Sequence, residues 1–154
     1  MSKKLDVSLF EVIVENTPLV SLDFIVVNPE NKVLLGQRLN RPAQHFWFVP
    51  GGRIRKNESI AAAFMRLTLE ELGVKLMLSD ANFLDVYEHF YNDNFSEKKF
   101  STHYVVLGYE IKTCLMLDAF PGEQHNKYLW FSIPELLSSE YVHQHTKDYF
   151  LNRI

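Results

Sequence analysis

The stretch from Gly52 to Val74 constrains the fold more than any other part of the sequence, because it sets carboxylates at fixed distances along a loop and a helix. Apolar residues recur in it at helical spacing and form one stripe: Ile60, Ala63, Phe64 and Leu67. Glu71 comes four residues after Leu67 and therefore lies on this stripe, which should face the core. A carboxylate that faces the core is costly unless a cation or hydrogen-bond donors meet it. The stretch thus predicts a buried acid with a partner.

The helix in this stretch is predicted over residues 59–72, with Gly73 as its left-handed stop. The turn before it, residues 49–52, contains two glycines that let backbone carbonyls approach a ligand closely. With an inward carboxylate beside it, this turn indicates a divalent metal, and Mg²⁺ takes few protein oxygens and completes its shell with water and substrate phosphates. The alternative is a solvated helix stabilised by an ion pair between Arg66 and Glu70.

Several polar residues outside this stretch are candidates for substrate binding. Asp23 interrupts an otherwise apolar predicted strand, so it needs a partner such as a sugar hydroxyl or a structural hydrogen bond. Tyr104 and His89 belong to later predicted strands, where such side chains more often pack in the core. Arg38 and Arg53 belong to different loops and could converge on a diphosphate through bidentate contacts, although each alone would be an ordinary surface charge.

The remaining periodicities predict an α/β fold in which a mixed sheet lies between helices. The predicted strands cover residues 19–27, 32–37, 83–91, 102–111 and 128–131, and residues 46–49 lead into the Gly-Gly turn. A short amphipathic helix precedes them and stops before Pro18. Ser132 and Pro134 mark the start of a further helix, and a final helix holds Tyr149 and Phe150.

Length, composition and charge limit the classes of protein to which the chain can belong. A length of 154 residues predicts a single domain, residues 1–154, and a hydrophobic content of 47% is enough for one core. The net charge of −3 argues against a nucleic-acid partner bound through general basicity. The single cysteine, Cys114, cannot form an internal disulfide, and no apolar run resembles a signal peptide or reaches the ~20 residues of a membrane span. We therefore expect a cytoplasmic protein with no membrane partner.

The same stretch resembles the Nudix box, written G-x5-E-x7-R-E-U-x-E-E-x-G-U with U an aliphatic residue. The matching positions are Gly52, Glu58, Arg66, Glu70, Glu71, Gly73 and Val74. Two positions depart from the pattern: Thr68 stands at an aliphatic position, and Leu67 replaces the first glutamate after the arginine. In most of the family this glutamate helps to hold metal or activates water. Its loss predicts fewer metals and a general base located elsewhere.

Further strings over nearly the whole chain resemble one branch of this superfamily, the GDP-mannose mannosyl hydrolases. They are Asn16–Val26, Asn40–Gln44, Trp47–Arg53, Phe90–Ser96, Thr102–Gly108 and Glu123–His125. Leu67 combined with the last of these strings is the specific signal for the branch. The resemblance implies the Nudix fold, with a mixed sheet sandwiched between helices, an Mg²⁺ cofactor, and a homodimer in which a helical arm, residues 1–18, makes dimer contacts.

In that branch, water attacks the anomeric carbon of the sugar and inverts it, rather than attacking phosphorus. The resemblance therefore implies GDP-mannose as substrate, with GDP-glucose as a second one, and GDP and the free sugar as products. The implied metal ligands are the Gly51 carbonyl, Glu71 and Gln124. The implied catalytic and substrate-binding residues are His125 as general base, Arg38 and Arg53 at the diphosphate, and Asp23, His89 and Tyr104 at the sugar.

The histidine assignments depend on this resemblance. Without it, His125 is a residue of a predicted loop, where a histidine is usually only exposed. The leucine at position 67 favours it as the base, because something must take a proton from water and histidine titrates nearest neutral pH. The other histidines are expected at the surface or in packing: His45, His103, His143 and His145. The last two are two apart on a predicted helix, so they should not share a face.

Two other functions stay open on the sequence. A conventional Nudix pyrophosphohydrolase would cleave a GDP-sugar at phosphorus and release GMP and a sugar phosphate. A nucleotide-sugar binding module without catalysis would carry Leu67 as a mark of lost activity. The role of Glu70 also stays open between metal ligand and partner of Arg66.

Overall fold

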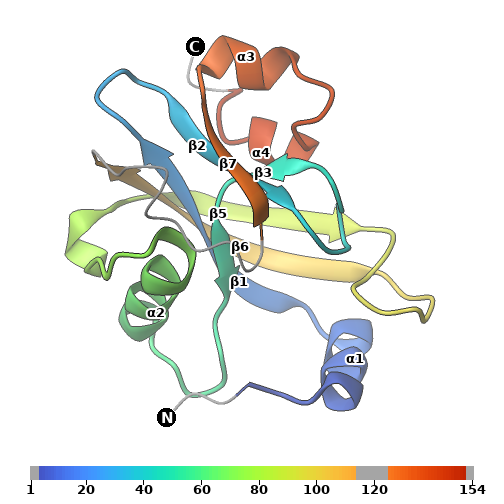
Figure 1. Ribbon diagram of the computed structural model, residues 1–154. Helices are drawn as coiled ribbons and strands as arrows, with labels where there is room; N and C mark the ends of the chain where they lie inside the picture. Colours follow the sequence, from blue (N-terminus) through green and yellow to red (C-terminus); the bar gives the residue numbers. More distant parts are fainter. Residues whose placement is uncertain (1–3, 114–124, 152–154) are drawn as a thin grey trace.

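A mixed sheet of seven strands organises the computed structural model, which describes residues 4–113 and 125–151 (Figure 1). Five strands follow the order β3-β2-β1-β6-β5, while β4 pairs with β1 and β7 pairs with β2. The strands are β1 (Leu19–Val27), β2 (Val33–Arg38), β3 (Trp47–Phe48), β4 (Gly51–Arg53), β5 (Asn82–Tyr91), β6 (Thr102–Lys112) and β7 (His125–Phe131). The expected mixed sheet is confirmed.

Strand β1 lies at the centre of the sheet and has different partners along its two edges. One edge pairs in parallel with β6 over the whole length of β1. The other edge is shared, because β4 pairs with residues 21–23 in antiparallel fashion and β2 joins at Val27. Asp23 pairs with Gly51 at the start of β4. The residue that interrupts the apolar strand therefore lies beside the Gly-Gly segment.

Helices cover both faces of the sheet (Figure 1). Helix α2 (Ile60–Leu72) packs on one face, and α3 (Ile133–Ser138) and α4 (Gln144–Lys147) lie on the other. Alternate residues of β1 divide between the two cores: Leu22, Phe24 and Val26 pack with α2, whereas Ile25 and Val27 pack with α3 and the C-terminal segment. Burial of both faces explains why β1 is apolar almost throughout. The expected sandwich of sheet and helices is confirmed.

Side chains at the helix ends explain where the helices begin and stop. The Ser59 hydroxyl accepts a hydrogen bond from the Ala62 N–H at 3.1 Å, and Gly73 ends α2 with a φ of 74°. Helix α1 (Val7–Asn16) begins at Asp6, whose carboxylate accepts from the Leu9 N–H at 3.0 Å. A short 3₁₀ turn, η1 (Leu78–Asp80), follows α2. None of the described helices combines the length and the apolar character that a bilayer crossing requires.

Three local expectations are wrong in detail. Residues 51–53 form a strand rather than only a turn, because β4 pairs with β1. Strand β7 begins at His125, not at position 128, because its pairing with β2 continues to Arg38 across a register shift. Tyr149 and Phe150 lie beyond α4, held by hydrogen bonds to carbonyls three residues earlier, so the final helix does not contain them.

Thr68, which stands at an aliphatic position of the box, joins α2 to the segment that follows it. Its side chain is fully buried, and its hydroxyl donates to the Met65 carbonyl at 3.2 Å. The same hydroxyl accepts from the backbone N–H of Leu76 at 3.0 Å, across the helix stop. The departure from the box pattern therefore satisfies a backbone donor that an aliphatic residue would leave without this acceptor.

Thr68→Val keeps the shape of the side chain and removes this acceptor. We expect the free energy of unfolding to fall by roughly 1–3 kcal/mol, the usual cost of a buried donor without its partner. Urea unfolding followed by circular dichroism measures the change, and Thr68→Ser, which keeps the hydroxyl, is the matched control. An unfolding midpoint of Thr68→Val equal to that of the wild type would contradict this role of the hydroxyl.

Candidate active site

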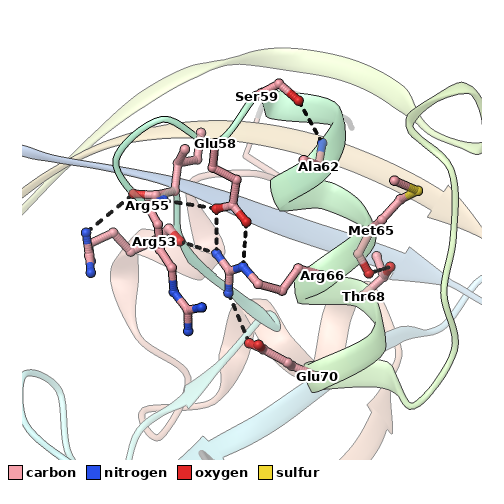
Figure 2. Close-up of polar contacts among 10 residues, drawn as sticks. Arg53, Arg55, Glu58, Ser59, Ala62, Met65, Arg66, Thr68 and Glu70 are labelled. Atoms are coloured by element: carbon pink, nitrogen blue, oxygen red, sulfur yellow. Dashed lines mark hydrogen bonds and ion pairs between the residues drawn. The ribbon is translucent and has the colours of Figure 1, made fainter. Parts of the chain in front are cut away.

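Arg66 on α2 is the centre of an ion-pair network that fixes the loop before the helix (Figure 2). Its guanidinium donates to both carboxylate oxygens of Glu58, at 2.7 and 2.9 Å, and to Glu70 at 3.1 Å. It also donates to the backbone carbonyl of Arg53 at 2.9 Å. The hydrogen bonds from Arg66 lower the pKa of Glu58, and those to Glu58 raise the pKa of Arg66. The network therefore orients the box loop against β4 and occupies Arg66 within the protein.

Leu67 fills the space between α2 and β4. Its side chain is 2% exposed, and a Cβ added to Gly52 would lie 2.4 Å from one of its methyl carbons. A side chain at position 52 would therefore meet this methyl group and require Leu67 to move. The position where the Nudix box has its first glutamate is thus packed with hydrocarbon against the strand backbone.

Backbone alternation in β4 directs the Gly51 carbonyl toward α2. The Pro50 carbonyl and the Ile54 N–H hydrogen bond to β1, so the backbone carbonyl and N–H groups of residues 51 and 53 point away from β1. The Arg53 carbonyl meets Arg66 of α2 on that side. Gly51 comes two residues before Arg53 in β4, and Glu71 comes five residues after Arg66 in α2. Glu71 is only 3% exposed. A buried carboxylate and a carbonyl from facing elements fit the few oxygen ligands that Mg²⁺ takes from a protein.

A pocket of about 210 Å³ opens beside this region, between β1, β2, β4, β5 and β6. It brings together six of the residues predicted from the sequence: Asp23, Arg38, Gly51, Arg53, His89 and Tyr104. Gln124 lies outside the described residues. Of His125 the backbone is described, and it pairs with Arg38, so strand β7 brings position 125 to a residue that lines the pocket.

A second, larger hollow of about 550 Å³ continues from this pocket and is strongly basic. The two share the lining residues Arg38, Pro42, Gly52, Arg53 and Tyr104. Among its described lining residues, Glu70 is the one acid, whereas the cations are Lys4, Arg38, Arg41, Arg53, Arg55 and Arg66. The guanidinium of Arg53 lies 4.9 Å from the ring centre of Phe10, which in turn contacts Phe95. Positive charge beside aromatic rings suits a phosphorylated nucleoside.

Asp23 lies at the floor of the smaller pocket. Burial raises its pKa to about 7, although a hydrogen bond from the Tyr149 hydroxyl and the charge of Arg38 both lower it. The Arg38 guanidinium is held by the Pro42 carbonyl, to which its Nε donates at 2.9 Å. Burial also lowers the pKa of Arg53. The lining of the pocket thus combines the Asp23 acid with the Arg38 cation.

His89, which lines the pocket, packs with His143 and His145, two histidines that were expected at the surface or in packing. His89 stacks on His145 with ring centres 4.3 Å apart, and His145 contacts His143 at 4.6 Å. Burial and the neighbouring histidines lower the pKa of His89 to about 3 and that of His143 to about 4. In the part of the chain that the structure describes, no group of three or more histidine, cysteine or acidic side chains is arranged to hold a metal. The lowered pKa values favour the neutral form of His89 and His143.

Sequence reasoning missed two kinds of residue at this site. Tyr149 and Tyr91 approach Asp23 from the C-terminal segment and from β5, and nothing in local periodicity links them to it. His143 caps α4 instead of lying within it, so the helical spacing that separated it from His145 does not apply. The sequence could have indicated this role, because His143 stands at a cap position directly before a short polar segment.

The histidine cluster should make the protein sensitive to acid. The pKa of His143 is lower in the fold than its ordinary 6.5, so the unfolded chain takes up a proton between pH 6.5 and about 4 that the folded chain does not. Stability is therefore lost as the pH falls through this range. His143→Asn keeps a capping side chain, and we expect the wild type to lose about 1 kcal/mol more than this variant between about pH 7 and 5. Urea unfolding over a pH series measures both slopes, and parallel slopes would contradict the assignment.

Comparisons with known proteins add to this geometry. The family model described as NUDIX domain matches residues 17–153. One relative is the low-salt glycan biosynthesis protein Agl8 of Haloferax volcanii, which is 44% identical over 102 residues, covering 66% of this chain. The match spans 64% of that relative, which is less than two thirds of its length.

Solved structures give the same fold. The MutT protein from Methanosarcina mazei Go1 is similar with a TM-score of 0.65 and 18% identity, over 88% of this chain and 92% of that one. The NUDIX domain of Shewanella oneidensis NrtR, in a cocrystal structure with ADP ribose, is similar with a TM-score of 0.62 and 17% identity, over 97% and 99% of the two chains. Since the family model spans most of the sequence and the fold agrees with it, the chain belongs to the NUDIX domain family.

Proposed function

We propose that this Nudix hydrolase cleaves GDP-mannose, with GDP-glucose as a second substrate, by Mg²⁺-dependent attack of water on the anomeric carbon with inversion. The observation that carries the proposal is the position of Leu67, whose side chain is buried against Gly52. The Nudix box has at this place a glutamate that helps to hold metal or activates water. Hydrocarbon can neither orient a water molecule nor take its proton, so the nucleophile must be held elsewhere.

The metal-binding part of the proposal rests on residues of β4 and α2. The Gly51 carbonyl and the buried Glu71 carboxylate belong to two elements that pack on each other, and Gln124 would add a neutral oxygen. When bound, Mg²⁺ would supply positive charge to the diphosphate oxygens and so stabilise GDP as it leaves. One carboxylate with neutral oxygens suits a single Mg²⁺ that keeps several coordination places for substrate.

The diphosphate would lie between the two hollows, against the arginines that both share. Arg38 and Arg53 come from β2 and β4, and each lines both the small pocket and the basic hollow. Two guanidinium groups would bind diphosphate oxygens in bidentate fashion and stabilise the charge that GDP gains on departure. The larger hollow, with Phe10 and Arg53 in contact, has room for the nucleoside.

The sugar would occupy the small pocket, whose floor and wall are polar. Asp23, His89 and Tyr104 line it and would hold the sugar hydroxyls and the bridging oxygen. An ionised Asp23 close to the ring would also favour the positive charge that spreads onto the ring oxygen as the glycosidic bond breaks. Such contacts would leave the anomeric carbon on the side of the diphosphate away from Leu67.

His125 is the proposed general base. Its backbone lies opposite Arg38 in the pairing of β7 with β2, so it begins a strand at the edge of the site. Histidine titrates near neutral pH and is the side chain suited to take a proton from water there. A base on β7 would hold the water on the sugar side of the diphosphate, where the anomeric carbon is the reachable electrophile.

Two further parts of the proposal concern the class of substrate and the oligomeric state. The relative named for low-salt glycan biosynthesis supports a substrate that carries a sugar, as in a nucleotide sugar. A homodimer with contacts through the helical arm, residues 1–18, is supported by exposed apolar side chains on α1, of which Val7 is 64% and Val12 55% exposed.

The test is to identify the products of GDP-mannose, GDP-glucose, ADP-ribose and UDP-glucose by chromatography with Mg²⁺ present. We expect GDP and free sugar from the two GDP-sugars and little turnover of the others. Glu71→Gln should lower the rate by about 10²-fold or more, because the metal contributes several kcal/mol of charge stabilisation. Glu70→Gln is the matched control, since Glu70 pairs with Arg66, and should lose less than about tenfold.

Other products would point to other functions. GMP with mannose 1-phosphate would return the chain to the conventional pyrophosphohydrolases. Binding of GDP-mannose without Mg²⁺-dependent turnover would indicate a binding module instead.

A further inference from the structure

Tyr149 connects the C-terminal segment to the floor of the sugar pocket. Its hydroxyl donates to Oδ2 of Asp23 and lies 3.3 Å from Nε2 of His89. The ring is 3% exposed and packs edge-on against Tyr87, with ring centres 4.5 Å apart. One hydroxyl thus contacts two of the residues assigned to the sugar, from a position 126 residues away from Asp23 along the chain.

We propose that Tyr149 is a positioning residue, which orients the Asp23 carboxylate and fixes His89 in the tautomer that carries its proton on Nε2. This role rests on the proposed function, in which Asp23 and His89 contact the sugar. Tyr149 does not line the pocket and therefore acts through these two side chains.

The tautomer follows from counting protons. A tyrosine hydroxyl has one proton, and above its pKa of about 7 the Asp23 carboxylate is ionised and can only accept, so that proton goes to Asp23. The Tyr149 oxygen is then an acceptor toward His89, and the contact at 3.3 Å requires a proton on Nε2. The result is a chain of donors from His89 through Tyr149 to Asp23. It leaves Nδ1 as the one acceptor of the His89 ring.

The two neighbouring histidines are fixed in the same form by other contacts. Nε2 of His145 lies 3.1 Å from the Phe90 carbonyl, which can only accept, so Nε2 carries the proton. Nδ1 of His143 accepts from the backbone N–H of His145 at 3.0 Å, so its proton is also on Nε2. Neither of these contacts involves Tyr149. They provide internal references for any change at His89.

For the site, this means that Tyr149 occupies one carboxylate oxygen of Asp23, while the other stays available to a sugar hydroxyl. Oδ2 is held by Tyr149, while Oδ1 lies 2.5 Å from the place that a Cβ on Gly51 would take. Glycine at position 51 therefore leaves room for this oxygen at the pocket wall. With Oδ1 fixed there, a sugar hydroxyl can donate to it in a single orientation, and the anomeric carbon is held in register with the diphosphate.

Tyr149→Phe removes the hydroxyl and keeps the ring in the core. Nitrogen NMR of isotope-labelled protein at about pH 8.5, where neutral histidines show distinct tautomer signals, is the first measurement. We expect the Nε2–H form for all three histidines of the wild type. In Tyr149→Phe, only His89 should change to a mixture of tautomers, while His143 and His145 keep their signals. An Nδ1–H form of His89 in the wild type would overturn the proposal, even if the variant failed to fold.

The second measurement separates positioning from packing. In Tyr149→Phe, kcat with GDP-mannose should fall about 10- to 100-fold, because the sugar is no longer held in register, while the Kd for GDP stays within about twofold. The matched control is Tyr109→Phe, the same change at a buried tyrosine of the core beside α2, which should leave both constants and the His89 signal unchanged.

Three outcomes decide between the interpretations. An unchanged kcat in Tyr149→Phe would overturn the positioning role, and so would a parallel loss of GDP affinity, which indicates a general disturbance of the fold. A wild type that releases no GDP from GDP-sugars would overturn the proposed function alone. The His89 signal, which does not depend on turnover, would still decide whether Tyr149 fixes this residue.

Discussion

The packing of α2 onto β4 is the constraint on which the rest of the site depends. Leu67 lies so close to the strand that a Cβ at position 52 would meet its methyl group, and Arg66 binds the Arg53 carbonyl one residue further along. These contacts fix the helix in register with the strand. They hold the helix that carries the buried Glu71 against β4. The same leucine that secures this register also removes a carboxylate from the place where the box usually has one.

The residues of the site form two sides, and each side is supported by different strands and helices. In the proposed complex, the anionic part of the substrate would face α2, β4 and β2, where cations line the larger hollow. The sugar would face β1 and β5, where Tyr149 and the histidine cluster contact Asp23 and His89. Arg38 and Arg53 lie on the boundary and line both hollows. A substrate with a diphosphate between a nucleoside and a sugar matches this division, since each part meets the chemistry that suits it.

Much of the fold followed from periodicity, because the signals were local. The strand at residues 19–27 and the helix that ends at Gly73 have the predicted bounds within a residue, since apolar spacing and a glycine stop act over a few positions. Strand β7 was predicted too short, because its first residues pair with Arg38 across an irregular register that the sequence does not display. The meeting of Arg38 and Arg53 could be suggested from residue types alone, but it is explained by the pairing of both β2 and β4 with one edge of β1. The contact between Tyr149 and Asp23 had no local signal at all, because it joins the two ends of the chain.

Attack of water on carbon rather than on phosphorus can be tested by following the oxygen atom of the water into the products. GDP-mannose is hydrolysed with Mg²⁺ in heavy-oxygen water, and mass spectrometry locates the label in the products. If Leu67 has moved the nucleophile to the sugar side, the label lies in the mannose and none is found in GDP, and the sugar first forms with inverted anomeric configuration. Label in GDP, GMP or a sugar phosphate would show attack at phosphorus and contradict this account.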